Sequence, residues 1–350
     1  MKNDLDTLID LVVKEGASDL HLGEGRVPYL RISGQLIALS KYPVLTNQFL
    51  SGVLNSVLTP SRKESWQSDQ STDFAYSSKN ERFRGHAFLD QQKICIALRH
   101  VQKKIPTLAE LNLPDVLTNF ARMRAGFFLV VGPTGHGKST TLASMIEIIN
   151  NERLENIITI EDPIEYMFTQ DKSVIHQREV GIDTPSFAKA LHDSFREDIN
   201  VIMVGEMRDS DTMATAVSAA ETGHLVFSTL HTNSAAQTVD RIIDSFESTQ
   251  QSQIRIQLAA SLTGIFSQRL VPKVSGGLVP VYELLINNTA ISNLIRDKRT
   301  HEINTVIETS SGDGMIDFNR CLVEKVRKGE ISIEMAYLYS MNPKSLEKML

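Results

Sequence analysis

One glycine-rich segment constrains this chain more than any other feature. Residues 132–139 read Gly-Pro-Thr-Gly-His-Gly-Lys-Ser and fit the pattern GxxxxGK[ST]. An apolar run at residues 127–131 precedes the segment, and a helical pattern at residues 140–149 follows it. A strand that enters such a turn and leaves as a helix points backbone N–H groups and a helix N-terminus at one centre. The segment therefore predicts a P-loop that binds the phosphates of ATP.

The candidate nucleotide-binding residues all come from this loop and the first turn of the helix after it. They are Gly132, Thr134, Gly135, His136, Gly137, Lys138, Ser139 and Thr140. We expect Lys138 to reach the β- and γ-phosphates and Ser139 to ligate Mg²⁺. His136 stands where a small residue is common, and we expect it to be tolerated because only its backbone has to face phosphate.

Acidic residues end two further apolar runs, which we predict to be strands of the same parallel sheet. Glu206 comes shortly after residues 201–204, and Glu161 follows residues 157–160. The carboxyl ends of parallel strands face the ligand crevice, so both carboxylates are expected beside the phosphates. We assign Glu206 to orienting or activating the attacking water, and Glu161 to the metal sphere, directly or through water.

A histidine follows the next predicted strand. His231 lies two residues beyond the apolar run at residues 224–229. An isolated histidine at a strand end is more often structural than functional. Beside two acidic strand ends and a P-loop, we favour a role as a sensor of the γ-phosphate.

The order of these segments predicts the fold class. From residue 125 onward apolar strands alternate with helices, which indicates an α/β domain with helices on both faces of a parallel sheet. Residues 249–350 are expected to be mostly helical, and residues 108–122 to form a helix. The chain of 350 residues is long enough for a second domain, and residues 1–101 combine an amphipathic helix with short strands. We therefore predict a small α+β domain at 1–101, a linker at 102–107 and the ATPase domain at 108–350.

Composition narrows the class of protein further. The net charge of −6 argues against a surface that grips nucleic acid throughout. Two distant cysteines, Cys95 and Cys321, exclude a four-cysteine zinc site and suit the reducing cytosol. No apolar run is long enough to span a membrane, and the N-terminus is acidic where a signal peptide would be basic. We expect a cytoplasmic protein that reaches the inner membrane only through a partner.

Four segments in order resemble the conserved boxes of a known family. Residues 132–141, 159–165, 204–209 and 223–234 resemble the Walker A, Asp box, Walker B and His box of type II/IV secretion ATPases. The likeness is closest to the PilT-type retraction ATPases of type IV pili, and residues 16–22 and 31–34 resemble the start of that family's N-terminal domain. The resemblance implies a RecA-like ATPase core, a PAS-like N-terminal domain and a homohexameric motor.

The resemblance also implies partners and further site residues. In such rings, arginines of a neighbouring N-terminal domain complete the ATP site, and Arg84 and Arg99 match those positions. Arg196 matches a further arginine, which is supplied in cis. A guanidinium group there would neutralise charge on the transferred phosphoryl group. The implied partners are an inner-membrane pilus platform protein and, as a further candidate, a paralogous ATPase.

Several functions remain open on the sequence alone. The leading hypothesis is an ATP-hydrolysing motor that removes pilin subunits and drives twitching motility. Residues 290–296 resemble a C-terminal segment of retraction ATPases, but with Ser292 inside it. Alternatives are an accessory retraction paralogue, a pilus-extension or secretion ATPase, and a regulatory subunit with little turnover. A nucleic-acid motor is less favoured because the chain lacks an aromatic–basic stripe.

Overall fold

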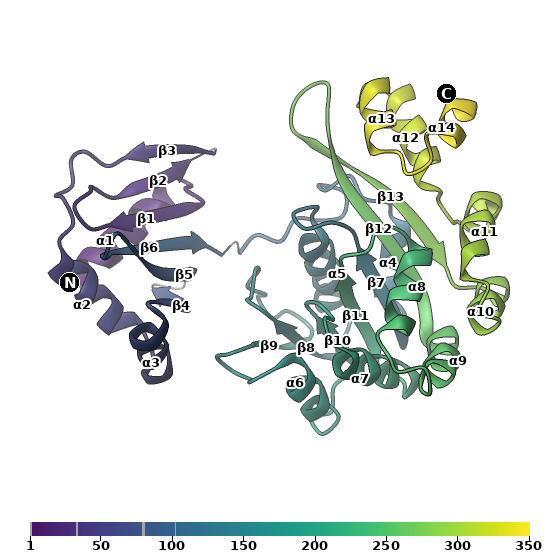
Figure 1. Cartoon of the computed structure of the whole chain (residues 1–350), viewed down its shortest axis with the longest axis horizontal. Coiled ribbons are helices and arrows are strands. Elements are labelled where there is room, and N and C mark those ends of the chain that lie inside the picture. The colour runs from purple at the N-terminus through teal and green to yellow at the C-terminus, as the bar shows by residue number, and fades with distance from the viewer. Residues whose placement is uncertain (1, 33, 79–80, 102) are drawn as a thin grey trace. The chain divides into compact units, whose positions relative to one another are not determined.

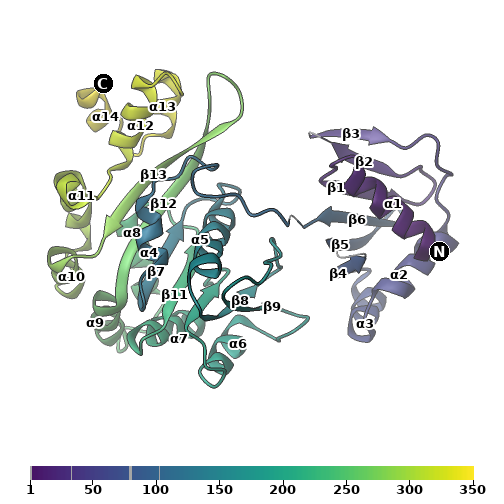
Figure 2. The same ribbon diagram turned by 180° about the vertical axis from the view of Figure 1, so that it is seen from behind.

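The computed structural model describes residues 2–32, 34–78, 81–101 and 103–350 (Figures 1 and 2). The chain divides into two compact units, Met1–Lys103 and Lys104–Leu350. Gln102, the first residue of the predicted linker, lies outside the described residues, as does Ser33 of the second N-terminal motif. No helix within the described residues combines the length and the apolar character that crossing a membrane requires.

The first unit is an antiparallel sheet packed against helices. Its strands follow the order β3-β2-β1-β6-β5-β4. Helices α1 and α2 pack on this sheet because Leu5, Ile9 and Leu50 enter one buried cluster with strand residues such as Leu20 and Leu98. The elements are α1 (Lys2–Lys14), β1 (Asp19–Gly23), β2 (Tyr29–Ile32), β3 (Gln35–Ala38), α2 (Asn47–Val57), α3 (Pro60–Asp69), β4 (Ser71–Ser78), β5 (Glu81–Asp90) and β6 (Lys93–His100).

Two details of this unit differ from the sequence prediction. Val13 is apolar and belongs to the amphipathic first helix, yet it is 41% exposed. The polar stretch at residues 61–73, where the sequence shows no helical apolar pattern, contains most of α3. Thr59 occupies the N-cap position and Pro60 the first turn of that helix, an arrangement that favours a helix start even in a polar sequence.

The second unit is built on a largely parallel sheet with the order β13-β12-β7-β11-β10-β8-β9. All neighbouring pairs are parallel except β12 and β13. The elements as far as the last strand are α4 (Val116–Ala121), β7 (Gly126–Val131), α5 (Lys138–Glu152), β8 (Asn156–Glu161), β9 (Val174–Glu179), α6 (Phe187–Ser194), β10 (Val201–Val204), α7 (Ser210–Glu221), β11 (Leu225–Leu230), α8 (Ala235–Asp244), α9 (Gln251–Ser261), β12 (Leu262–Pro272) and β13 (Leu278–Ile286).

Helices cover both faces of this sheet, as the alternation of elements predicts (Figure 1). Phe127 and Leu129 of β7 pack into a cluster with α7, α8 and α9. Phe128 and Val130, the alternate residues, pack into a second cluster with α4 and α5. Burial on both faces explains why the strand reads as a continuous apolar run rather than an alternating one. The α/β fold class is confirmed.

The C-terminal part corrects one prediction. Residues 249–350 were expected to be mostly helical, yet β12 and β13 form a long hairpin on the sheet beside β7. Polar residues such as Gln268 and Arg269 interrupt the apolar pattern of β12 and hide the strand in the sequence. Helices fill the remainder, namely α10 (Thr289–Arg296), α11 (Ile303–Thr309), α12 (Phe318–Arg327), α13 (Ile333–Tyr339) and α14 (Pro343–Met349).

Two smaller elements also differ from expectation. Strand β9 was not predicted, and it pairs with β8 at one edge of the sheet. The predicted helix at residues 108–122 is helical only over α4. Pro114 precedes α4, and Asn112 takes the left-handed conformation with a φ of 55°, so the chain turns there instead of continuing a helix.

Candidate active site

The P-loop joins the carboxyl end of β7 to the start of α5. Gly132, Gly135 and Gly137 have φ values of 144°, 80° and 80°, a range that side chains disfavour. A Cβ atom added at Gly132 would lie only 2.2 Å from the backbone oxygen of Gln268 on β12. Gly137 occupies the N-cap position of α5, so the N-terminus of this helix opens directly onto the loop.

Lys138 lies folded over the loop that carries it. Its Nζ donates hydrogen bonds to the carbonyl oxygens of Gly132 and Pro133, each at 2.9 Å. The side chain is 7% exposed, and burial lowers the pKa of its ammonium group from the ordinary value. A phosphate that enters the loop would offer this buried cation a charged acceptor in place of two neutral carbonyl groups.

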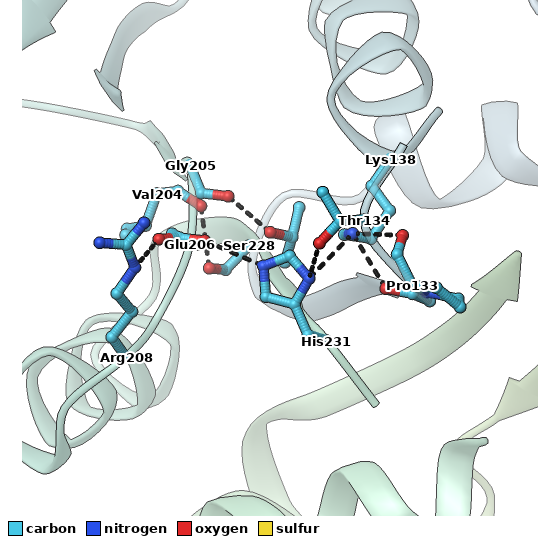
Figure 3. A network of polar contacts seen from close by, with 11 residues as sticks. Pro133, Thr134, Lys138, Val204, Gly205, Glu206, Arg208, Ser228 and His231 are labelled. Atoms are coloured by element: carbon cyan, nitrogen blue, oxygen red, sulfur yellow. Dashed lines mark hydrogen bonds and ion pairs between the residues drawn. The ribbon is translucent and has the colours of Figure 1, made fainter. Parts of the chain in front are cut away.

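His231 bridges the P-loop and the acidic strand end (Figure 3). Its Nε2 lies 3.0 Å from Oε2 of Glu206. On the other side, its Nδ1 lies 3.3 Å from Thr134 Oγ1 and 3.4 Å from Lys138 Nζ. Burial lowers the pKa of His231 from its ordinary value of 6.5, and the cations of Lys138 and Arg208 lower it further. The imidazole is therefore neutral near pH 7.

The contacts of this neutral imidazole select its tautomer. Glu206 offers a carboxylate, so Nε2 carries the hydrogen and donates it. Lys138 and Thr134 offer donors to Nδ1, which then accepts. Arg208 forms an ion pair with the second carboxylate oxygen of Glu206. The result is a polar chain that runs from Arg208 through Glu206 and His231 to Lys138 (Figure 3).

Two hydroxyl groups hold the ends of β10 and β11 together beneath this chain. Ser228 Oγ donates to the carbonyl oxygen of Val204 at 2.8 Å. Thr229 Oγ1 donates to the carbonyl oxygen of Gly205 at 2.6 Å. Both hydroxyl-bearing residues are buried, and their bonds fix the separation between the strands that carry Glu206 and His231.

Glu161 ends β8 and is buried. Its Oε1 accepts hydrogen bonds from Thr159 Oγ1 at 2.6 Å and Gln177 Nε2 at 3.2 Å. Its Oε2 accepts the backbone N–H of Glu165 at 3.4 Å. Burial raises the pKa of the Glu161 carboxyl to about 7, because desolvation disfavours the charged form.

A cleft of about 490 Å³ brings most of the predicted site residues together. Predicted residues that line it are Thr134, Gly135, Gly137, Lys138, Ser139, Thr140, Glu161, Glu206 and His231. His136 is not among them, because its Nδ1 turns to β12 and accepts the backbone N–H of Leu270 at 2.8 Å. This contact explains how a bulky residue fits in the loop.

The cleft offers a donor set suited to a hydrated Mg²⁺ rather than to a protein-caged metal. Among the described residues there is no group of three or more His, Cys, Asp or Glu side chains that could hold a metal ion. Ser139 and Glu161 do line the same cleft. One hydroxyl and one carboxylate, completed by phosphate oxygens and water, match the way Mg²⁺ is usually held in nucleotide sites.

The three predicted arginines lie elsewhere. Arg196 is exposed and follows α6, ahead of the amino end of β10, whereas the cleft lies at the carboxyl end of that strand. Arg196 is not among the residues that line the cleft, and its role as an arginine supplied in cis stays a prediction. Arg84 and Arg99 belong to the first unit, where they stand directly opposite each other on β5 and β6. Arg99 Nε also donates to Asp19 Oδ1 at 2.9 Å.

Sequence reasoning missed two glutamines that organise the site. Gln268 of β12 donates to the carbonyl oxygen of His136 at 2.9 Å and accepts from Thr141 Oγ1 at 2.8 Å. Gln177 of β9 holds Glu161 and also donates to the carbonyl oxygen of Tyr166 at 2.8 Å. Each lies on a strand that was not predicted. Gln268 stands between apolar stretches of β12, whereas the residues around Gln177 are mostly polar and give no strand pattern.

Comparison with known proteins identifies the family. The family described as "Type II/IV secretion system protein" matches residues 1–334. This chain belongs to that family. Its relatives include the Pseudomonas aeruginosa "Type IV pilus retractation ATPase PilT", which is 39% identical over 95% of this chain and 97% of its own length. The same organism's "Type IV pilus ATPase PilU" is 37% identical over 99% of this chain and 91% of its own.

A solved structure supports the same family assignment. The crystal structure of the pilus retraction motor PilT with bound ADP has a TM-score of 0.90 and 44% sequence identity to this chain. The match covers 97% of this chain and 98% of the other. The predicted resemblance to the PilT-type members is thereby confirmed over nearly the whole chain.

Proposed function

We propose that this protein hydrolyses ATP and uses the energy to drive retraction of a type IV pilus. The observation that carries the proposal is the contact of His231 with Glu206 on one side and with the P-loop residues Thr134 and Lys138 on the other. This chain of contacts lies in a protein that is 39% identical to a pilus retraction ATPase over 95% of its length. It links phosphate binding to a carboxylate that can act on water.

The P-loop supplies the binding energy for the phosphates. Backbone N–H groups of the loop and the N-terminus of α5 provide partial positive charge. Lys138 adds a full charge, which burial leaves poorly solvated when no anion is present. The similarity to a retraction motor solved with ADP supports a nucleoside di- or triphosphate as the ligand.

Glu206 is the proposed group for orienting or activating the attacking water. Its carboxylate is held by Arg208 and by the Nε2 hydrogen of His231, so its direction is set before ATP arrives. When Lys138 turns toward a phosphate, Nδ1 of His231 loses a donor and can accept one from a water molecule that hydrates the γ-phosphate. His231 is thus suited to report whether the γ-phosphate is present.

Mg²⁺ is the proposed metal. Ser139 and Glu161 would hold it, directly or through water, because both line the cleft and supply oxygen ligands. When bound, Mg²⁺ supplies charge neutralisation between the β- and γ-phosphates. Burial raises the pKa of Glu161 to about 7, so part of this carboxyl group is protonated near neutral pH. A bound cation would favour its ionised form.

We further propose a homohexamer in which Arg84 or Arg99 completes the ATP site of a neighbouring subunit. The two arginines stand directly opposite each other on paired strands, where like charges repel, and Asp19 forms an ion pair with Arg99. A phosphate of ATP bound to the next subunit would offset the charge of Arg84. The proposed location is the cytoplasmic side of the inner membrane, at a pilus platform protein.

A second candidate is an accessory role beside another retraction ATPase. Two relatives of this chain, the retraction ATPase PilT and the pilus ATPase PilU, come from one organism, and this chain is 39% and 37% identical to them. Secretion and pilus-assembly ATPases match only about half of this chain, and no observation on the described residues favours a nucleic-acid motor.

Deletion of the gene in its own host tests the proposal. Cells without a retraction motor should carry excess pili and fail to twitch, and cells without an extension motor should carry none. A wild-type gene should restore twitching, and a Glu206→Gln gene should not. Retained twitching with normal pilus numbers would contradict a primary retraction role. Reduced twitching force alone would indicate the accessory role instead.

A further inference from the structure

The hairpin of β12 and β13 holds the loop that carries His231. Ser267 Oγ of β12 donates to the carbonyl oxygen of Asn233 at 2.9 Å. Glu283 of β13, which is directly paired with Ser267, accepts the backbone N–H of Ala235 at 2.8 Å. Arg269 Nη2 donates to the side-chain oxygen of Asn233 at 3.0 Å. The position of His231 therefore depends on this hairpin as well as on its own strand.

Arg269 also contacts the C-terminal helices. Its Nη1 donates to the carbonyl oxygen of Tyr339, the last residue of α13, at 3.4 Å. Its guanidinium carbon lies 5.5 Å from the centre of the Phe318 ring of α12. One side chain thus contacts the His231 loop with one nitrogen and the C-terminal helices with the other nitrogen and its planar face.

The C-terminal helices are packed on the same hairpin. Leu322 of α12, Ala336 of α13 and Leu346 of α14 form one buried cluster with Val279 and Val281 of β13. In both views α12, α13 and α14 lie together at the end of the hairpin (Figures 1 and 2). A displacement at the hairpin would therefore be transmitted to these helices as a group, because close-packed clusters move as units.

We propose that Arg269 is a positioning residue that couples the His231 loop to helices α12 and α13, so that loss of the γ-phosphate changes the position of α13. The inference rests on the proposed function, because a nucleotide has to reach His231. Asn233 lies only two residues from His231, so a shift of the histidine moves the oxygen that Arg269 holds. The planar guanidinium cannot follow one partner without changing its contact with the other.

The chain offers variants that separate the two sides of this contact. Arg269→Lys keeps the charge but has no fork, so it can keep at most one of the two hydrogen bonds. Asn233→Ala removes the partner in the loop and leaves the contacts with α12 and α13 intact. Arg122→Lys is a matched control, because Arg122 makes a two-nitrogen contact with Glu152 at 2.7 Å far from the loop in sequence.

Hydrogen–deuterium exchange on the full chain tests the coupling. Exchange is measured without nucleotide, with ADP and with a non-hydrolysable ATP analogue. In the wild type, the exchange rate of Ile333–Tyr339 should differ at least twofold between the two nucleotides. Arg269→Lys and Asn233→Ala should abolish that difference and leave the protection of the P-loop by nucleotide unchanged. The double variant should behave like either single variant, and Arg122→Lys like the wild type.

Steady-state kinetics gives a second reading. Arg269→Lys should lower kcat at least fivefold and leave KM for ATP within twofold, because the hydrogen bonds of Arg269 to described residues go to Asn233 and Tyr339 and not to the P-loop. The coupling would be overturned if both variants kept the difference in α13 exchange between ADP and the ATP analogue. It would also be overturned if the wild-type protein showed no such difference although nucleotide protects its P-loop. Equal loss of P-loop protection and thermal stability would make Arg269 a purely structural residue. If no nucleotide protects the P-loop, the proposed function fails instead.

Discussion

At the scale of single residues, the site depends on one neutral histidine between an anion and a cation. Glu206 and Lys138 would attract each other directly if His231 were absent. The histidine separates them and gives each a hydrogen-bond partner, so the carboxylate stays directed toward the cleft. A protonated His231 would have no acceptor for Lys138 and would add a second positive charge beside it.

Substitution of His231 should separate hydrolysis from binding. We expect His231→Gln to lower ATP turnover at least about tenfold, since it loses the polar bridge to Glu206. The affinity for ADP should change by less than about twofold, because ADP has no γ-phosphate to report. Turnover assays and ADP titrations measure the two effects. His224→Gln is the control, because His224 precedes the other end of β11.

The dependence of ATP turnover on pH tests which protonation state of His231 is active. The pKa of His231 is lowered below 6.5, so the imidazole stays neutral from pH 6.5 upward. At saturating Mg²⁺ and ATP, turnover of the wild type should have an acid limb below pH 6.5, where His231 gains a proton. The acid limb should weaken in His231→Gln. A histidine-dependent fall above pH 7 would contradict the assignment.

Glu283 should make the stability of the protein depend on pH. Burial raises the pKa of its carboxyl group to about 7, above the ordinary value of 4.5. The folded chain therefore holds a proton that the unfolded chain has released. The contribution of this group to the unfolding free energy falls by about 1.4 kcal/mol per pH unit between those two values.

Glu283→Gln removes this titration and keeps an oxygen for the N–H of Ala235. The melting temperature of the variant, measured relative to the wild type at pH 5, 6, 7 and 8, should rise as the pH rises. Circular dichroism or scanning calorimetry gives the comparison. A difference that is constant from pH 5 to 8 would show that Glu283 does not titrate in this range.

At the scale of elements, the nucleotide site is a junction between the P-loop and the hairpin of β12 and β13. Gln268 is 3% exposed and bonds to both His136 and Thr141. Its backbone oxygen lies where a side chain on Gly132 would begin. The shape of the P-loop therefore depends on a strand that enters the sheet about 130 residues later, as well as on the loop's own glycines.

Alanine substitution at two glycines of the P-loop separates the effect of backbone conformation from the effect of contact with β12. Gly132→Ala combines a disfavoured φ with a clash against backbone, and should cost about 3 kcal/mol or more and abolish ADP binding. Gly135→Ala has a positive φ but nothing within 4 Å, so it should cost only about 1–2 kcal/mol. Urea unfolding and ADP titration measure both effects. Equal losses would mean that contact with β12 is unimportant.

At the scale of the whole molecule, the predicted site residues are divided between two units with separate cores. The P-loop, Glu206 and His231 belong to Lys104–Leu350, and Arg84 and Arg99 belong to Met1–Lys103. Arg99 has an ion pair with Asp19 and so has a structural role in its own unit. This makes Arg84 the better candidate for a contact with the ATP of a neighbouring subunit.

Mixing of inactive variants tests this division. Arg84→Ala and Glu206→Gln should each lose most ATP turnover. In the proposed ring every ATP site needs Glu206 from one subunit and Arg84 from its neighbour, and each variant removes one of the two from all sites. Mixed rings formed at equal concentrations should regain about a quarter of wild-type turnover, since some sites combine two intact sides. A mixture of Lys138→Ala and Glu206→Gln should stay inactive, because both residues lie on the same side. No recovery in proven mixed rings would place the arginine function elsewhere.

Local patterns were enough to predict the P-loop, the parallel strands and the carboxyl-end positions of Glu161, Glu206 and His231. The physical reason is that strand, glycine turn and helix follow one another directly in the chain, and parallel strands end at one edge. Three further features could be seen only once the chain was folded. They are the separation of His231 from Glu206, the hydrogen bonds of Gln268 to the P-loop, and the distance of Arg196 from the cleft. These features depend on contacts between distant segments, and on a strand whose polar residues hide its pattern. Local sequence was therefore sufficient to predict a P-loop nucleotide site, and long-range packing selected the side chains that complete it.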